Sequence, residues 1–265
     1  SDLAYHNSLM VQIWSAIAAK DATLMVHTMS RFAGLPSTTA WGVYLRCHDD
    51  IGWAIDDTDA HEVGLNGHDH RMFLAEYFEG SFYGSLATGE PFMPDPVSGE
   101  RRTSGTGASL AGIEKALKLK DEKQLALAIE RYLKAEDNRW LHRPKMNWKV
   151  ADAAAAGELD DKAAGIIFNR IKHVIEVRKS LPSLHAGVAT TVRKGTGQGV
   201  VIFDRVHPAG DIVQVYNLSD SPRWLTATEL GTLSGSVTDH LTGHTFDIGA
   251  GVPLAPYEMR WFTQG

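Results

Sequence analysis

The hydrophobic pattern of this chain changes once, near residue 186, and that change constrains the fold more than any other feature. Before it, apolar residues recur at helical spacing, as in Leu9, Ile13, Trp14 and Ile17. After it, short runs rich in β-branched and aromatic residues recur about every ten residues between turn residues, which is typical of an antiparallel sandwich. The sequence therefore predicts a C-terminal β-sandwich domain over residues 186–265.

The part before residue 186 contains several helical patterns. Asp21 and Asp121 stand where they can cap helices, and Leu181-Pro182 is expected to end the last one. The helices are expected over residues 3–19, 21–32, 70–78, 104–117, 121–133 and 160–180.

One short β-type run, over residues 42–53, ends in the consecutive groups His48, Asp49 and Asp50. In open α/β sheets and barrels, ligands collect at the carboxyl ends of parallel strands. The stretch therefore predicts a ligand site, with a polar turn as the alternative. Side chains alternate along an extended chain, so the two aspartates diverge and any facing carboxylate must come from elsewhere.

Residues 56–102 are rich in Gly, Pro, Asp and aromatic residues, and a stretch of this kind inside a compact domain is expected to be an insertion that closes over a ligand. A complete (β/α) barrel needs about 250 residues. Residues 1–185 are too few and contain one convincing parallel strand, so the predicted fold class is α/β. The expected architecture is a partial (β/α) barrel with an inserted lid region, followed by the β-sandwich.

Composition narrows the function classes. The net charge is -6 without a basic cluster, so neither nucleic acid nor an anionic membrane is an expected partner. The single cysteine, Cys47, excludes an internal disulfide and a multi-cysteine metal site. No apolar run reaches membrane-spanning length and no signal peptide opens the sequence, so a cytoplasmic protein is expected. His68 and His70 are interpreted as surface or helix-start residues rather than metal ligands.

Five motifs in a fixed order resemble the amylosucrase family, the sucrose-using glucosyltransferases of the α-amylase type. The motifs cover residues 46–53, 67–74, 80–85, 102–106 and 139–144. The resemblance implies transfer of the glucosyl unit of sucrose to an α-1,4-glucan, with release of fructose, through a covalent glucosyl-enzyme. It implies an eight-stranded barrel with inserted domains and a C-terminal β-sandwich. It implies no metal or organic cofactor.

The resemblance also assigns roles to residues. Asp49 matches the acid that stabilises the oxocarbenium-like transition state, and His48 matches a histidine that hydrogen-bonds the same glucosyl ring. Asp50 and Arg102 match residues on the fructosyl or acceptor side. Arg139 matches an arginine of the glucosyl subsite, and Arg143 is its companion there.

Two departures from the family pattern limit this expectation. The nucleophilic aspartate and the acid/base glutamate of the family lie on earlier barrel strands, which these residues do not include. After residue 135 the helix runs almost directly into the 136–144 loop, where the family has an eighth strand and a long loop. Retaining glycosyl transfer needs both a nucleophile and a proton donor, so the chain alone is expected to be inactive.

Three alternatives remain open at this point. The chain is a non-catalytic carbohydrate-binding or assembly remnant, or it has sucrose hydrolase or α-glucosidase activity. A metal-dependent phosphohydrolase built on His48 and Asp49 is disfavoured, because such pairs sit on helices and this one follows a strand. Sucrose and an α-glucan acceptor are the expected partners, and barrel helices without their strands are expected to expose apolar surface and promote self-association.

Overall fold

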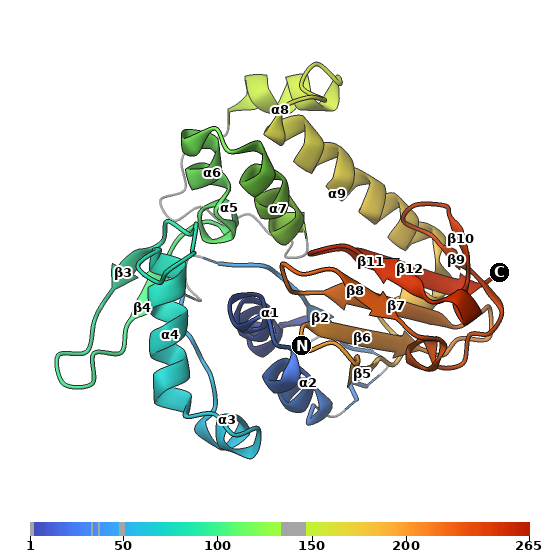
Figure 1. Ribbon diagram of the computed structural model, residues 1–265, viewed down its shortest axis with the longest axis horizontal. Helices are drawn as coiled ribbons and strands as arrows, with labels where there is room; N and C mark the ends of the chain where they lie inside the picture. The colour runs from blue at the N-terminus through green and yellow to red at the C-terminus, as the bar shows by residue number, and fades with distance from the viewer. Residues whose placement is uncertain (1–2, 33, 37, 48–50, 134–146) are drawn as a thin grey trace.

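A computed structural model describes residues 3–32, 34–36, 38–47, 51–133 and 147–265 (Figure 1). The first part is mainly helical and the second is a β-sheet that lies against it. The elements before residue 185 are β1 (Leu3–Tyr5), α1 (Asn7–Ala19), α2 (Thr23–Ser30), β2 (Ala40–Gly42), α3 (Asp57–Glu62), α4 (Gly67–Glu79), β3 (Glu90–Phe92), β4 (Arg102–Ser104), α5 (Gly107–Ala111), α6 (Ile113–Leu119), α7 (Glu122–Leu133), α8 (Trp148–Ala155), α9 (Ala163–Ser180) and the 3-10 turn η1 (Pro182–Leu184).

Helices α1 and α2 form where the apolar spacing predicts them. Met10, Trp14 and Ile17 of α1 are buried, and the Trp14 indole donates to the Leu45 carbonyl at 2.9 Å. The carboxylate of Asp21 accepts from the backbone N–H of Thr23 at 2.7 Å, so this residue supports the start of α2 as expected. The apolar stripe of α1, part of which was expected to lack a packing partner, is therefore covered at Met10, Trp14 and Ile17.

Strands β1 and β2 pair in parallel, with Leu3 opposite Ala40 and Tyr5 opposite Gly42. They form the only parallel pair among the described residues, and those residues form no closed barrel. The prediction that the run 42–53 begins as a strand is wrong, because β2 ends at Gly42. Tyr44, Leu45 and Arg46 are buried in an irregular segment beyond it, which is why their apolar run was mistaken for a strand.

The stretch 56–102 contains more regular structure than expected. Besides α4, which was predicted as a shorter helix, it holds α3 and one strand of the antiparallel pair β3–β4. Asp56 caps α3 through the N–H groups of Thr58 and Asp59, and Asn66 caps α4 through that of Asp69. Helix α3 has no apolar stripe long enough to be recognised from the sequence.

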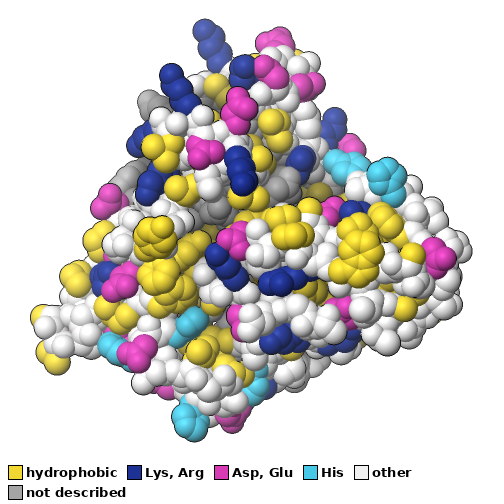
Figure 2. All heavy atoms as spheres, in the orientation of Figure 1, with side chains coloured by type: hydrophobic (Ala, Val, Ile, Leu, Met, Phe, Trp, Pro, Cys, Tyr) yellow, Lys and Arg dark blue, Asp and Glu magenta, His cyan; other side chains and the backbone are white. Residues whose placement is uncertain are grey.

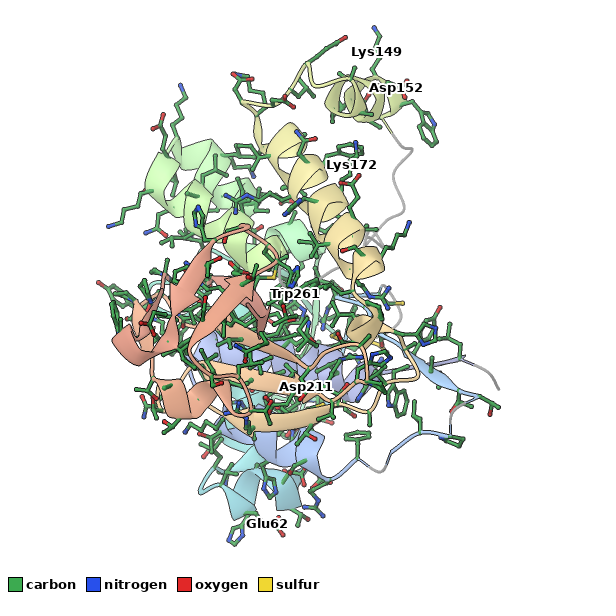
Figure 3. The ribbon with its side chains drawn as sticks, turned by 90° about the vertical axis from the view of Figure 1, so that its right-hand side faces the viewer. Glu62, Lys149, Asp152, Lys172, Asp211 and Trp261 are labelled. Carbon is green, nitrogen blue, oxygen red and sulfur yellow. The ribbon has the colours of Figure 1, made fainter. Side chains whose placement is uncertain are left out.

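The helices after β4 depart from prediction at two places. Gly112, with φ of 84°, divides the predicted helix 104–117 into α5 and α6. Helix α8 was not predicted; Trp148 on it is 69% exposed. Figure 3 shows α9 running from α8, which carries Lys149 and Asp152, toward the sheet near Trp261.

The C-terminal part is a six-stranded antiparallel sheet with the order β10-β9-β12-β7-β6-β5, covered on one face by the pair β8–β11. It is a sandwich in part, since the second layer has two strands rather than a full sheet. The strands are β5 (Thr191–Lys194), β6 (Val200–Arg205), β7 (Ile212–Asn217), β8 (Arg223–Leu225), β9 (Ser236–Asp239), β10 (Thr245–Asp247), β11 (Val252–Leu254) and β12 (Met259–Gln264).

Residues of this sheet belong to three hydrophobic cores, the smallest of which joins Ile212 and Trp261 to Leu184. Ile202, Val215 and Phe262 pack toward β8 and β11, whereas Val201 and Tyr257 pack in the core that contains α1 and α2. A direct backbone hydrogen bond, from Ala22 N–H to Gln198 C=O at 2.8 Å, joins the two parts. The domain boundary near residue 186 stays a prediction. No described helix is long and apolar enough to be a candidate membrane span.

Candidate functional site

A pocket of about 300 Å³ lies beside the segment that follows the predicted His-Asp-Asp motif. Arg102, which was predicted as a site residue, is in its lining. The other predicted site residues, His48, Asp49, Asp50, Arg139 and Arg143, lie outside the described residues. The lining consists of Gly52, Trp53, Ala54, Arg71, Met93, Glu100, Arg101 and Arg102.

Arg46 fixes the segment from which this pocket is built. Its guanidinium is fully buried and its Nη2 donates to the Ile51 carbonyl at 2.8 Å and to the Thr103 carbonyl at 2.6 Å. It also lies 4.6 Å from the centre of the Trp53 ring, in cation–π geometry. One buried side chain thus joins the chain on the two sides of residues 48–50 to strand β4.

Two further hydrogen bonds reinforce the same junction. The backbone N–H of Thr103 donates to the Ile51 carbonyl at 3.1 Å, and the indole N–H of Trp53 donates to the Thr103 hydroxyl at 2.9 Å. The Trp53 ring stacks on Phe78 of α4 at 4.9 Å between ring centres. The described ends of the predicted motif are therefore held rigidly against the insertion, on the side where Arg102 lies.

Two of the three arginines that line the pocket among the described residues are paired with carboxylates. Arg71 donates to Glu100 Oε1 from Nε at 3.0 Å and from Nη2 at 2.8 Å, and to Asp57 at 2.7 Å. The hydrogen bond from Arg71, with a second from His68, holds the pKa of Glu100 below its usual range. Among the described residues, Glu100 is the one carboxylate of the lining, and it is ionised, so it serves as an acceptor and not as a proton donor.

The two neighbouring arginines differ. Arg101 is bound to both oxygens of Glu79 at 3.0 and 2.9 Å, and this hydrogen bonding raises its pKa. Arg102 is exposed and makes no ion pair with any residue in the described ranges. Arg102 is thus the cation of this pocket that a polar or anionic ligand can reach.

Sequence reasoning missed Arg46, Arg71, Glu100 and Thr103 as parts of this site. Two of the motifs that carry the resemblance contain Arg46 and Arg71, so these motifs could have indicated that both residues belong to the site. Nothing in the local pattern around Glu100 indicates that it pairs with Arg71, because the contact joins residues 29 positions apart.

A second polar cluster, His27, Asp59 and Glu62, has the residue types of a metal site. Arg31 binds both carboxylates there, Asp59 at 2.7 Å and Glu62 at 3.0 Å. The guanidinium supplies the positive charge that a metal would, so we interpret the cluster as an ion-pair network between α2 and α3.

The two histidines considered in the sequence do not share a site. His68 contacts Glu100 at 2.8 Å, whereas His70 is buried and pairs with the Ser15 hydroxyl at 2.8 Å. Burial lowers the pKa of His70. Both histidines lie at the start of α4, as one of the two interpretations expected, but His70 is not a surface residue, because it packs on the α1 side of the helix.

Exposed apolar side chains gather on the insertion, at the left of the view in Figure 2. Tyr83 is 98% exposed and Val97 is 94% exposed, and Phe92 and Met93 lie between them in the sequence. The insertion is therefore one of the places where the described chain exposes large hydrophobic groups, while Trp148, Val206 and Trp224 are exposed elsewhere.

Comparison with known proteins gives one family match. The model of the amylosucrase C-terminal domain matches residues 192–263, which run from β5 to β12.

Solved structures give distant matches. Ttha1563 from Thermus thermophilus is 14% identical with a TM-score of 0.47, over 100% of this chain and 48% of that one. AmyP in complex with maltose is 12% identical with a TM-score of 0.45, over 99% and 50%. The α-amylase of Geobacillus thermoleovorans, complexed with acarbose, is 17% identical with a TM-score of 0.32, over 37% and 22%. The chain spans about half or less of the length of these proteins. Its C-terminal sheet is similar to the C-terminal domain of amylosucrases.

Proposed function

We propose that the chain is part of an amylosucrase-type glucosyltransferase, which moves the glucosyl unit of sucrose to an α-1,4-glucan and releases fructose. The family match over residues 192–263 supports this for the sheet. For the helical part, the observation that carries the proposal is the contact between two separate motifs. Arg46, of the motif 46–53, is hydrogen-bonded to Thr103, of the motif 102–106, at the edge of a pocket.

The roles of the individual residues are part of the proposal. Asp49 stabilises positive charge on the glucosyl ring, and His48 hydrogen-bonds that ring. Arg139 and Arg143 serve the same subsite, while Asp50 and Arg102 contact the fructosyl or acceptor side. The exposure of the Arg102 guanidinium and its lack of an ion-pair partner among the described residues agree with a role in ligand contact.

The chain alone should bind sugar weakly and not cleave it. Glycosyl transfer with retention needs a nucleophile and an acid about 5 Å apart across the bond. Glu100, the carboxylate of the pocket lining, is held ionised by Arg71. With the ring contacted on one side, we expect a dissociation constant in the millimolar range or weaker, about -4 kcal/mol.

Sugar binding can be followed through Met93, which lines the pocket. In protein labelled with ¹³C at the methionine methyl groups, sucrose should shift the Met93 signal, and Arg102→Gln should weaken the response. Arg170→Gln, an exposed arginine of α9 outside the pocket, is the matched control. A Met93 signal that ignores sucrose and maltotriose up to high millimolar concentration would contradict the proposal.

Turnover is tested separately by measuring fructose release from sucrose against a blank without protein. We expect no release. Release that disappears in Asp49→Asn would contradict this expectation and would show that another acid of the chain acts as nucleophile.

The arginine-bound state of Glu100 also favours a second candidate, a carbohydrate-binding remnant without chemistry. The two differ in ligand preference. A transferase fragment should respond to sucrose, whereas a remnant that binds glucans should respond to maltotriose and not to sucrose.

A further inference from the structure

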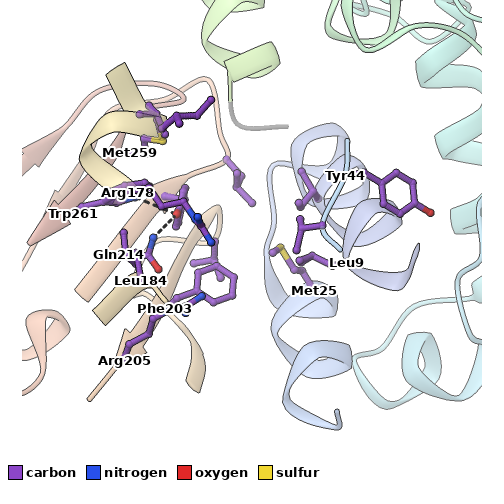
Figure 4. A pocket seen from close by; sticks show the side chains of 17 residues that line it. Leu9, Met25, Tyr44, Arg178, Leu184, Phe203, Arg205, Gln214, Met259 and Trp261 are labelled. Carbon is purple, nitrogen blue, oxygen red and sulfur yellow. Dashed lines mark hydrogen bonds between the residues drawn. The ribbon is translucent and has the colours of Figure 1, made fainter. Parts of the chain in front are cut away.

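A second cavity, of about 310 Å³, lies between the C-terminal sheet and the helical part (Figure 4). Met259 and Trp261 from the sheet stand on one side of it, and Leu9 and Met25 from α1 and α2 stand on the other. It is separate from the pocket around Arg102, since no described residue lines both. Most of its lining is apolar, as in cavities that hold small organic ligands.

Two arginines line this apolar cavity, and no described residue of its lining carries a carboxylate. Arg178 comes from α9 and Arg205 from the end of β6, both on the sheet side of the cavity in Figure 4. Among the described residues, neither guanidinium has an ion-pair partner. Arg178 is exposed, whereas Arg205 is half-buried. Like charges repel each other and a half-buried guanidinium is costly to desolvate, and an anion between the two would relieve both effects.

The guanidinium of Arg205 is poorly hydrogen-bonded for a group that is half-buried. Its Nε is buried without a hydrogen-bond partner, and its Nη1 reaches the carbonyls of His185 and Val188 only at 3.4 and 3.5 Å. Burial lowers the pKa of Arg205, and the charge of Arg178 acts in the same direction. An arginine nevertheless stays protonated in proteins, so the charge persists.

The other polar groups of the cavity are few and already oriented. The Tyr216 hydroxyl accepts from the Gln214 amide at 3.0 Å and from the Trp261 indole at 3.2 Å. A sugar presents hydroxyl groups around its whole ring, and so few polar side chains cannot satisfy them. The lining therefore fits a ligand with one charged end and an apolar body better than it fits a carbohydrate.

We propose that this cavity binds a small amphipathic carboxylate, with the carboxylate between Arg178 and Arg205 and the apolar body against Leu9, Met25 and Met259. Arginine pairs well with carboxylates because its planar fork donates two parallel hydrogen bonds. The cavity volume equals that of about ten water molecules at roughly 30 Å³ each, which is room for about ten non-hydrogen atoms. This site is independent of the sugar pocket and goes beyond the proposed transferase function.

The test uses octanoate as the probe and octan-1-ol as its neutral counterpart. In protein with ¹³C-labelled methionine methyl groups, octanoate should shift the signals of Met25 and Met259 and leave that of Met93 unchanged. The alcohol should bind at least about 10-fold more weakly than octanoate, because it lacks the charge-assisted hydrogen bonds. Equal binding of acid and alcohol, or no shift of Met25 and Met259 by octanoate, would overturn the proposal.

Variants separate the charge effect from simple hydrophobic binding. Arg205→Gln should weaken octanoate binding about 10-fold and leave octan-1-ol binding unchanged, whereas Arg170→Gln on α9 should change neither. Unchanged signals of Met10 and Met93 show that each variant is folded. Maltose that shifts Met25 and Met259 where octanoate does not would identify a sugar site and refute the inference. Since Met93 reports the other pocket, failure here is distinguishable from failure of the proposed function.

Discussion

Replacing Arg46 by methionine tests the junction on which the candidate site is built. Methionine fills much of the same space but donates no hydrogen bond. The variant loses the bonds to the Ile51 and Thr103 carbonyls and the cation–π contact with Trp53. Hydrogen bonds to charged groups contribute about 1.5–3 kcal/mol each.

The net loss is smaller than the sum of these terms. Ile51 keeps one donor, the backbone N–H of Thr103, and the variant no longer has to bury a guanidinium, which costs several kcal/mol. We therefore expect the free energy of unfolding to fall by about 3 kcal/mol, with the Thr103 carbonyl as the group left without this donor.

Urea unfolding and amide hydrogen exchange measure this loss globally and locally. The Thr103 amide, which donates to Ile51, should exchange about 100-fold faster in Arg46→Met, since 1.4 kcal/mol is a factor of ten. Arg102→Met is the matched control, because this exposed arginine should change stability by less than about 0.5 kcal/mol. Equal stability of the two variants, or an unchanged Thr103 exchange rate, would refute the role of Arg46.

Three further predictions concern stability. Burial lowers the pKa of His6 to about 4, and its Nδ1 accepts from the Leu9 N–H, so the neutral ring is favoured in the folded state. The free energy of unfolding should therefore decrease as pH falls from 6.5 to 4, by about 3 kcal/mol at most. His6→Asn should flatten this part of the pH profile and leave the smaller effect of His70. Gly80→Ala should destabilise the protein by about 1–3 kcal/mol more than Gly64→Ala in thermal unfolding. Both glycines have φ of 80°, but a Cβ at Gly80 would lie 2.3 Å from the Ala87 carbonyl oxygen, whereas a Cβ at Gly64 would meet open space; equal melting temperatures would rule this out. Asp239→Asn should lower the free energy of unfolding in urea by about 3–5 kcal/mol, since the fully buried carboxylate accepts from Arg260, Thr242 and the Trp261 N–H. Asp220→Asn, in an exposed pair with Lys20, should lower it by less than about 1 kcal/mol, and the reverse order would contradict the structural role of Asp239.

The elements that sequence reasoning located are those that bury a periodic set of side chains. Met10, Trp14 and Ile17 mark α1, and the alternation in β12 puts Phe262 in one core. Helix α8 escaped because its side chains are mostly exposed, with Trp148 as the largest.

The candidate site was predicted less completely, for a physical reason. The carbonyl of Thr103 is 57 positions from Arg46, and a single long-range hydrogen bond leaves no periodic trace in the sequence. A buried run such as Tyr44–Cys47 looks the same whether it pairs as a strand or packs as an irregular segment. Arg102 was found only because a motif contained it.

The packing of α1 and α2 against the sheet has a consequence for synthesis on the ribosome. Lys20 bonds to Asp220 across 200 positions, and Lys194 bonds to Thr23 across 171. At about 5–20 residues per second, roughly 10–40 s pass between translation of the first partner and the second. During that interval the strands that cover Leu24 and Met25 of α2 have not yet been synthesised, so these apolar side chains are exposed. The nascent chain should therefore be a good substrate for chaperones that hold apolar segments until translation ends.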